Sequence, residues 1–185
     1  YFKVKLSSVK SSYVIYTSTF PRSMYSFNTL RTAASKKLQF GAKQYIKNII
    51  NEAIIHPQIV CMLYRRDVIK NANLRFTVGC VRNEDAEFFT KYLANVETVN
   101  SSDYVGYYYR ENETSAVHKF NEKSLTFIEA DRRISQYLVE RDIYPISNYI
   151  MSSSVQYFVY KCARQQNKEI YSLVHERYDV RKEMA

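Results

Sequence analysis

The sequence predicts a mixed α/β fold that changes to an all-helical region at about residue 121. Glycine and proline are scarce, at 3 each in 185 residues, which fits long helices with few tight turns. Hydrophobic residues make up 46% of the chain, which suits one ordinary core and argues against global disorder. We therefore divide the chain into an α/β part, residues 1–120, and a helical extension, residues 121–185.

Strand, loop and helix patterns follow one another in the first third of the chain. Residues 13–17 are β-branched and aromatic and are typical of a strand, whereas residues 18–40 are polar and predict a long loop. A helix is expected from Ala42 to about His56, because apolar residues recur there at helical spacing. These apolar residues are Tyr45, Ile46, Ile49, Ile50, Ala53 and Ile54.

The middle of the chain combines short buried elements with one longer helix. Residues 60–64 predict a buried element, and a short helix is expected near residues 66–71. A longer helix is expected from Asn83, a favourable N-cap residue. Its inner face should carry Phe88, Phe89, Tyr92, Leu93 and Val96. Residues 96–99 and 104–109 have the composition of strands.

Helical spacing continues from Phe120 to the end of the chain. Apolar residues at 128, 134, 137 and 138 predict one helix, which should end near Pro145. A second helix is expected through residues 146–161, and a third up to Tyr178. No internal repeat is visible.

The net charge of +9 resides in the first 51 residues, which contain no acidic residue, whereas the remainder is formally neutral. Such a basic segment attracts phosphate-bearing partners or an anionic lipid surface. Acidic residues upstream of Tyr1 would balance the same charge, which is an equally good interpretation. Nucleic-acid binding is disfavoured, because the sequence has no RNP motif, Gly-x-x-Gly clamp or Cys/His finger.

Cysteine usage predicts a reducing, cytoplasmic environment. Cys61, Cys80 and Cys162 are odd in number and widely spaced, which argues against a disulfide framework and a structural zinc site. The longest apolar run, residues 59–63, is far shorter than the roughly 18 residues of a membrane-spanning helix. The chain begins at Tyr1 rather than methionine and without a secretory leader, so we expect a further segment upstream.

Two adjacent carboxylates, Glu84 and Asp85, fall in the first turn of the helix expected from Asn83. Their simplest role is structural, because a helix N-terminus favours acidic residues by roughly 0.3–1 kcal/mol each. The same effect is expected to lower the pKa of such a carboxyl group. Glu87, one turn further on, has the ordinary interpretation of a solvated helix residue.

Motifs on either side of this pair point to an enzyme. NEDAEFF (residues 83–89) is preceded by LYRRDVIKNANLRF (residues 63–76) and followed by YYYRENETS (residues 107–115). In this order and spacing the motifs resemble the second half of family-two glycosyltransferases with the GT-A fold, of the type that builds bacterial capsules or lipopolysaccharide. The resemblance implies the C-terminal, acceptor-side portion of a GT-A fold, followed by an α-helical extension.

The resemblance also implies roles for individual residues. Asp85 would be the catalytic base that accepts the proton of the acceptor hydroxyl, and Glu84 would support it. Arg110, with Tyr109 and Ser115, would bind the departing diphosphate through its planar guanidinium group. Alternatively, Arg110 forms a structural ion pair with one of the two carboxylates.

Donor and metal binding are expected outside this chain. GT-A enzymes hold Mg²⁺ or Mn²⁺ with an Asp-x-Asp motif, which the sequence does not contain. His118 lies where some of these enzymes supply a metal ligand, but a lone histidine is more often a surface residue. We therefore expect the nucleotide-sugar site and the metal ligands upstream, and this chain alone should be inactive.

The predicted function is inverting transfer of a sugar from a nucleotide-diphosphate donor to a glycan or lipid-linked acceptor at the inner face of the cytoplasmic membrane. One alternative is a non-catalytic binding module that contacts an anionic surface or nucleic acid through residues 1–51. Another is a helical assembly domain in which residues 121–185 form a homodimer interface, and this is compatible with a transferase.

Overall fold

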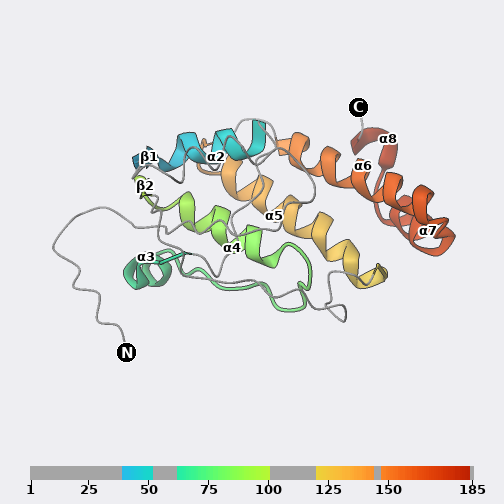
Figure 1. Cartoon of the computed structure of the whole chain (residues 1–185), viewed down its shortest axis with the longest axis horizontal. Coiled ribbons are helices and arrows are strands. Elements are labelled where there is room, and N and C mark those ends of the chain that lie inside the picture. The colour runs from blue at the N-terminus through green and yellow to red at the C-terminus, as the bar shows by residue number, and fades with distance from the viewer. Residues whose placement is uncertain (1–38, 52–61, 101–119, 144–146, 184–185) are drawn as a thin grey trace, which may run out of the picture.

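The computed structural model describes residues 39–51, 62–100, 120–143 and 147–183, and helices predominate among them (Figure 1). The strands expected at residues 13–17 and 104–109 lie outside these residues. β1 (Gln39–Gly41) pairs antiparallel with β2 (Thr98–Asn100), with Phe40 opposite Val99. The prediction of a loop over residues 18–40 is therefore wrong for its last two residues, because Gln39 and Phe40 belong to a strand.

The helices predicted before residue 100 begin where expected. α2 (Ala42–Asn51), α3 (Arg66–Asn71) and α4 (Glu84–Leu93) confirm these positions. β2 starts two residues later than the strand predicted at 96–99. The reason is that the backbone still turns after α4, where the amide of Val96 donates to the carbonyl of Leu93 at 3.3 Å.

The three helices predicted in the last third are also confirmed, as α5 (Thr126–Val139), α6 (Ser147–Gln165) and α7 (Lys168–Arg177). The 3-10 turn η3 (Glu122–Leu125) and the short helix α8 (Val180–Glu183) were not predicted as separate elements. Asn121 caps η3 by accepting a hydrogen bond from the backbone of Lys123 at 3.1 Å, while Ser124 accepts one from the backbone of Asn121 at 3.2 Å. This reciprocal cap fixes the point at which the helical region begins.

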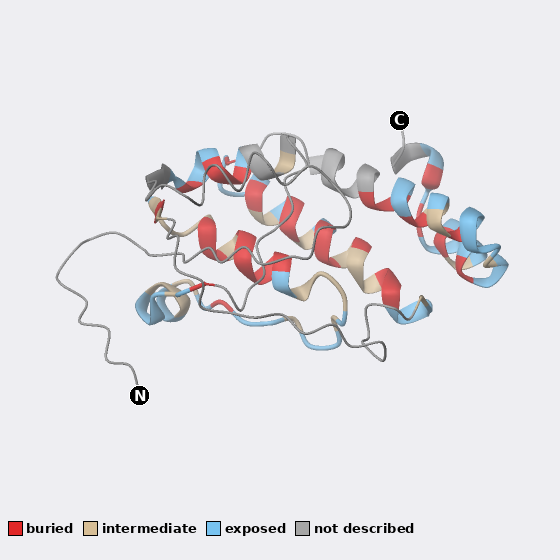
Figure 2. Ribbon diagram, in the orientation of Figure 1, coloured by how far each residue is buried: buried red, intermediate tan, exposed pale blue. Residues whose placement is uncertain are grey.

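α5 lies at the centre of the described fold, with α4 against one side and α6 against another (Figure 1). Its C-terminal half packs into a core with α2, α4 and β2, whereas its N-terminal half packs with α6, α7 and α8. The buried faces of α4, α5 and α6 are the red segments in Figure 2. The apolar core is thus continuous across residue 121, and the division into two domains stays a prediction.

Tyr92 shows how α4 holds the preceding segment in place. Its side chain is fully buried, its ring meets the Tyr64 ring edge-on at 4.8 Å, and its hydroxyl accepts a hydrogen bond from the amide of Arg65 at 2.8 Å. The start of α3 is therefore fixed to the C-terminal end of α4.

We expect Tyr92→Phe to lower the free energy of unfolding by about 1 kcal/mol, because phenylalanine keeps the ring contact but loses the hydrogen bond. Urea denaturation measures the change. Tyr160→Phe is the matched control, because Tyr160 is exposed on α6 and its substitution should have almost no effect. Equal losses in the two variants would contradict the role of the Tyr92 hydroxyl.

The described residues form a mainly helical structure with one two-stranded antiparallel sheet. The assignment to part of a GT-A fold stays a prediction. In the portion of the chain that the structure describes, no helix is both long and apolar enough to span a membrane.

Candidate functional site

The predicted carboxylate pair lies at the N-terminus of α4. Glu84 is partly exposed and Asp85 is exposed. Asn83 occupies the N-cap position, as predicted, but its side chain does not cap the helix. Instead, Asn83 adopts a left-handed backbone conformation with φ of 64°, and its side-chain amide points to α5. The predicted start of the helix is therefore correct, but the predicted capping role of Asn83 is wrong.

The pKa of Asp85 differs from the expectation for a helix terminus. Reduced hydration of the carboxyl group, and then the charge of Glu84, raise the pKa of Asp85 above its usual value. The lowered pKa expected from the helix dipole is thus wrong. A raised pKa makes Asp85 a better proton acceptor, which suits general base chemistry.

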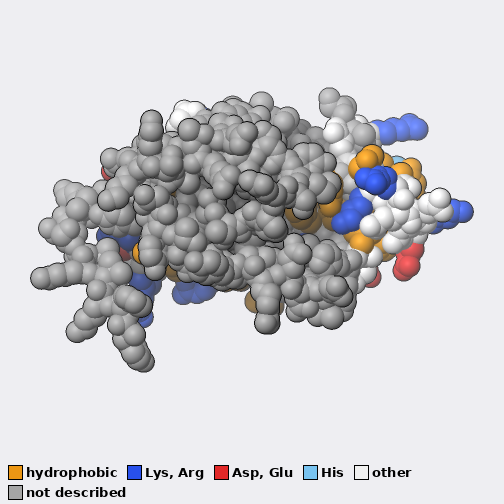
Figure 3. Space-filling model, in the orientation of Figure 1, with side chains coloured by type: hydrophobic (Ala, Val, Ile, Leu, Met, Phe, Trp, Pro, Cys, Tyr) orange, Lys and Arg blue, Asp and Glu red, His pale blue; other side chains and the backbone are white. Residues whose placement is uncertain are grey.

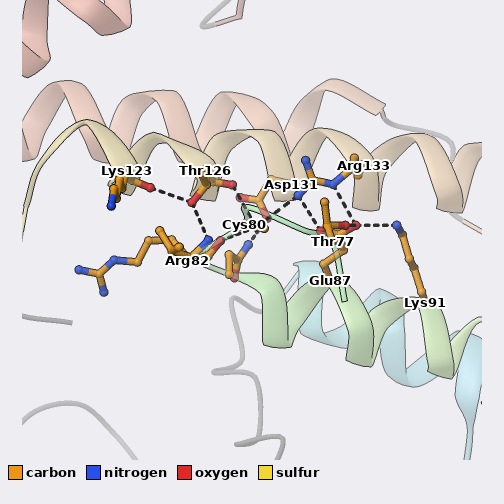
Figure 4. Close-up of polar contacts among 11 residues, drawn as sticks. Thr77, Cys80, Arg82, Glu87, Lys91, Lys123, Thr126, Asp131 and Arg133 are labelled. Carbon is orange, nitrogen blue, oxygen red and sulfur yellow. Dashed lines mark hydrogen bonds and ion pairs between the residues drawn. The ribbon is translucent and has the colours of Figure 1, made fainter. Parts of the chain in front are cut away.

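Glu87 is the main correction to the sequence-based interpretation. Far from being a solvated helix residue, it is buried and holds together α4, α5 and the loop before α4 (Figure 4). Its carboxylate accepts two hydrogen bonds from Arg133, at 2.9 and 2.7 Å, and one from Lys91 at 2.6 Å. Thr77 donates a further bond at 2.9 Å. Burial raises the pKa of Glu87, but these hydrogen bonds outweigh it and leave the pKa below its usual value.

The loop between Thr77 and Asn83 is tied to α5 by further polar contacts. The Arg133 guanidinium group lies 3.3 Å from the Cys80 sulfur, and the amide of Val81 donates to the Thr126 hydroxyl at 3.3 Å. The thiol of Cys80 donates to the carbonyl of Arg82 at 3.2 Å. Contacts with α5 therefore fix the loop that precedes α4 at several points.

Asp131 connects the α4 N-terminus to the helices behind it. It lies in the middle of α5 with only 6% of its surface exposed. Its carboxylate accepts a hydrogen bond from the Asn83 side-chain amide at 2.6 Å and another from the hydroxyl of Ser154 on α6. Burial raises the pKa of Asp131 to about 7, although both hydrogen bonds favour the charged form.

The titration of Asp131 predicts a pH-dependent stability. A carboxyl group with a pKa near 7 when folded and near 3.8 when unfolded stabilises the fold fully at low pH, and this contribution is lost as the pH rises towards 7. Asp131→Asn removes the titration and keeps the shape. We expect its stability relative to the unsubstituted protein to increase between about pH 4 and pH 7 and then to level off. Denaturant melts across this range measure the difference, and a constant difference would contradict a buried, titrating Asp131.

The remaining predicted site residues lie outside the described residues. They are Tyr109, Arg110, Ser115 and His118. Among the residues that the structure does describe, no group of three or more His, Cys, Asp or Glu side chains could hold a metal ion. Residues 1–38 of the basic segment also fall outside the description.

Two residues of α5 that support the α4 N-terminus, Asp131 and Arg133, were not identified from the sequence. Asp131 could have been found, because it falls three residues after Ile128 and seven before Leu138, on the apolar stripe of its helix. An acidic residue on such a stripe must find buried hydrogen-bond partners. Arg133 carries no comparable signal, because its partner Glu87 is distant in the sequence.

Comparisons with known proteins give no match: no protein-family model, no curated protein sequence and no solved structure resembles the chain significantly.

Proposed function

We propose that this chain is the acceptor-side part of a sugar transferase, with Asp85 as the catalytic base. The observation that supports this best is an exposed carboxyl group of raised pKa on a helix N-terminus that buried polar contacts hold in place. A general base must be accessible to its substrate and fixed relative to it. Asp85 meets both conditions within the motif that resembles family-two glycosyltransferases.

An aromatic surface next to Asp85 suits a sugar acceptor. Phe88 follows Asp85 by three residues, so the two side chains leave neighbouring positions on α4. Phe76 stacks on Phe88 with ring centroids 4.6 Å apart and is 50% exposed. A half-exposed aromatic face can pack against the apolar face of a sugar ring, while the carboxylate accepts a hydroxyl proton.

The proposed reaction uses Asp85 late in the transfer. The acceptor hydroxyl oxygen forms a bond to the anomeric carbon as the bond from that carbon to the diphosphate oxygen breaks. The hydroxyl proton passes to Asp85, and the nucleoside diphosphate leaves with the bonding electrons. Attack opposite the leaving group inverts the anomeric configuration. A divalent metal, Mg²⁺ or Mn²⁺, would stabilise the departing diphosphate in the complete enzyme.

This function places the active protein at the cytoplasmic face of the membrane, where nucleotide sugars and lipid-linked glycans meet. Basic residues in positions 1–51 would then contact the anionic lipid surface. In this proposal a segment other than residues 1–185 would supply the donor site, the metal ligands and the choice of sugar.

Acceptor binding tests the proposal on residues 1–185 alone. Backbone NMR during titration with a panel of oligosaccharides should show shifts of the Glu84, Asp85 and Phe88 amides for at least one saccharide. Tyr171 and His175 on α7 provide an internal control and should not move. No shift at the α4 N-terminus with any saccharide would contradict the proposal, as would sugar transfer catalysed by these residues alone.

Assembly through the C-terminal helices is a second candidate function, which is compatible with the first. Tyr157, Tyr160 and Tyr171 are exposed on α6 and α7. At the end of the molecule formed by the C-terminal helices, apolar and basic side chains lie side by side (Figure 3). Sedimentation of the intact chain and of a variant with all three tyrosines changed to serine should show a dimer only in the first.

A further inference from the structure

The contact between Asn83 and Asp131 joins three elements at one point. Asn83 directly precedes the carboxylate pair, Asp131 belongs to α5, and Ser154 belongs to α6. Asp131 and Ser154 are both buried, at 6% and 4% exposed. A buried carboxylate that accepts hydrogen bonds from two other elements fixes the position of both.

The backbone of Asn83 explains why this contact affects Asp85. A left-handed conformation is uncommon at a residue other than glycine, although asparagine adopts it more readily than most, and it persists where its surroundings hold it. Here the Asn83 carbonyl accepts the first hydrogen bond of α4, from the amide of Glu87 at 2.9 Å. The Asn83 side chain is bound to Asp131 rather than to the helix. A change in the backbone torsions of Asn83 would therefore reorient the first turn of α4 and, with it, the side chains of Glu84 and Asp85.

We propose that Asp131 is a positioning residue that, through Asn83, holds Asp85 at the correct place for proton transfer from the sugar acceptor. This inference rests on the proposed function of Asp85. Asp131 itself is buried behind the helix and does not touch the substrate.

The chain offers substitutions that separate positioning from folding. Asp131→Asn keeps both contacts, because its oxygen accepts from Asn83 and its amide donates to Ser154. Asp131→Leu has the same branching of the side chain but is larger, and it removes both contacts. Asn83→Gly removes the same contact from the other side, and glycine accepts the left-handed backbone without cost.

The first arm of the test is NMR of residues 1–185 at fixed pH. The amides of Glu84 and Asp85 should shift or broaden in Asp131→Leu but keep their positions in Asp131→Asn. Amides of Ile170 and Val174 on α7 report on the rest of the fold. Unchanged Glu84 and Asp85 amides in a folded Asp131→Leu variant would overturn the proposal.

The second arm measures sugar transfer in the protein that includes its donor-binding segment. Asp131→Leu and Asn83→Gly should each lower kcat by about tenfold to a hundredfold with an unchanged KM for the donor, as expected for a misplaced base. Asp131→Asn should restore kcat to nearly its original value. If Asp131→Leu does not fold, Asn83→Gly carries the test.

The two proposals fail in different ways. If Asp85→Asn abolishes transfer while Asp131→Leu and Asn83→Gly leave kcat unchanged, positioning by Asp131 is overturned and the transferase proposal stands. If Asp85→Asn itself leaves transfer unchanged, the role of Asp85 as base is wrong, and so is the positioning that rests on it.

Discussion

Replacing Asp85 with asparagine is expected to lower kcat for sugar transfer by about 10²–10⁴-fold, the usual contribution of a positioned general base. Asparagine has nearly the same shape but cannot accept the proton of the acceptor hydroxyl at this stage of the reaction. Binding of the donor should not change, because the proposal assigns the donor site to a segment other than this chain. The measurement is release of nucleoside diphosphate and of the glycosylated product by the protein with its upstream segment.

Two controls sharpen this comparison. Glu140→Gln changes an exposed carboxylate that directly follows α5 and should leave kcat unchanged. Glu84→Gln removes the neighbouring charge that helps to raise the pKa of Asp85, so it should lower kcat less than Asp85→Asn does. A variant Asp85→Asn with kcat within about threefold of the original would contradict a general base, which contributes much more than this.

Replacing Glu87 with alanine should lower the free energy of unfolding by about 3–5 kcal/mol, as breaking a buried ion pair generally does. The substitution leaves the Arg133 guanidinium group without its main anionic partner, and Thr77 and Lys91 each lose a hydrogen bond. The contacts of α4 with its preceding loop and with α5 are thus lost together, as is one contact within α4. Urea denaturation followed by circular dichroism measures the change.

Glu140→Ala is the matched control for this experiment. Glu140 is a glutamate at the C-cap of α5 that also has an arginine neighbour, but it is exposed and lies 4.0 Å from Arg141. Its substitution should change the stability by less than about 0.5 kcal/mol, which is typical of surface positions. A loss below about 1 kcal/mol for Glu87→Ala would show that the buried ion pair contributes no more than a surface one.

Local patterns were sufficient to predict the longer helices of the described region. Helical spacing of apolar residues placed the start of α2 at Ala42, and a favourable N-cap residue placed the start of α4 at Asn83. The strand pairing of Gln39 with Asn100 was not predicted, because it joins short segments far apart in the sequence. Such pairing depends on how α2 and α4 pack rather than on the composition of three residues.

The polar contacts of the site were harder to predict than its helix. Glu87 looked like a surface residue, because it is charged, follows Glu84 and Asp85 in the first turn and has a lysine four residues later. Its burial results from α5, which covers that side of α4 and brings Arg133 to it. Asn83 was given the role of a cap for a similar reason, since no local pattern shows that Asp131 competes for its side chain.

The sequence of the reading frame upstream of the Tyr1 codon tests the transferase proposal most directly. We expect a strand-rich segment of roughly 90–120 residues, ending in an apolar strand and an Asp-x-Asp motif, to complete an α/β nucleotide-binding half. A start codon at or near Tyr1 would contradict the proposal, because the protein would then lack a donor site.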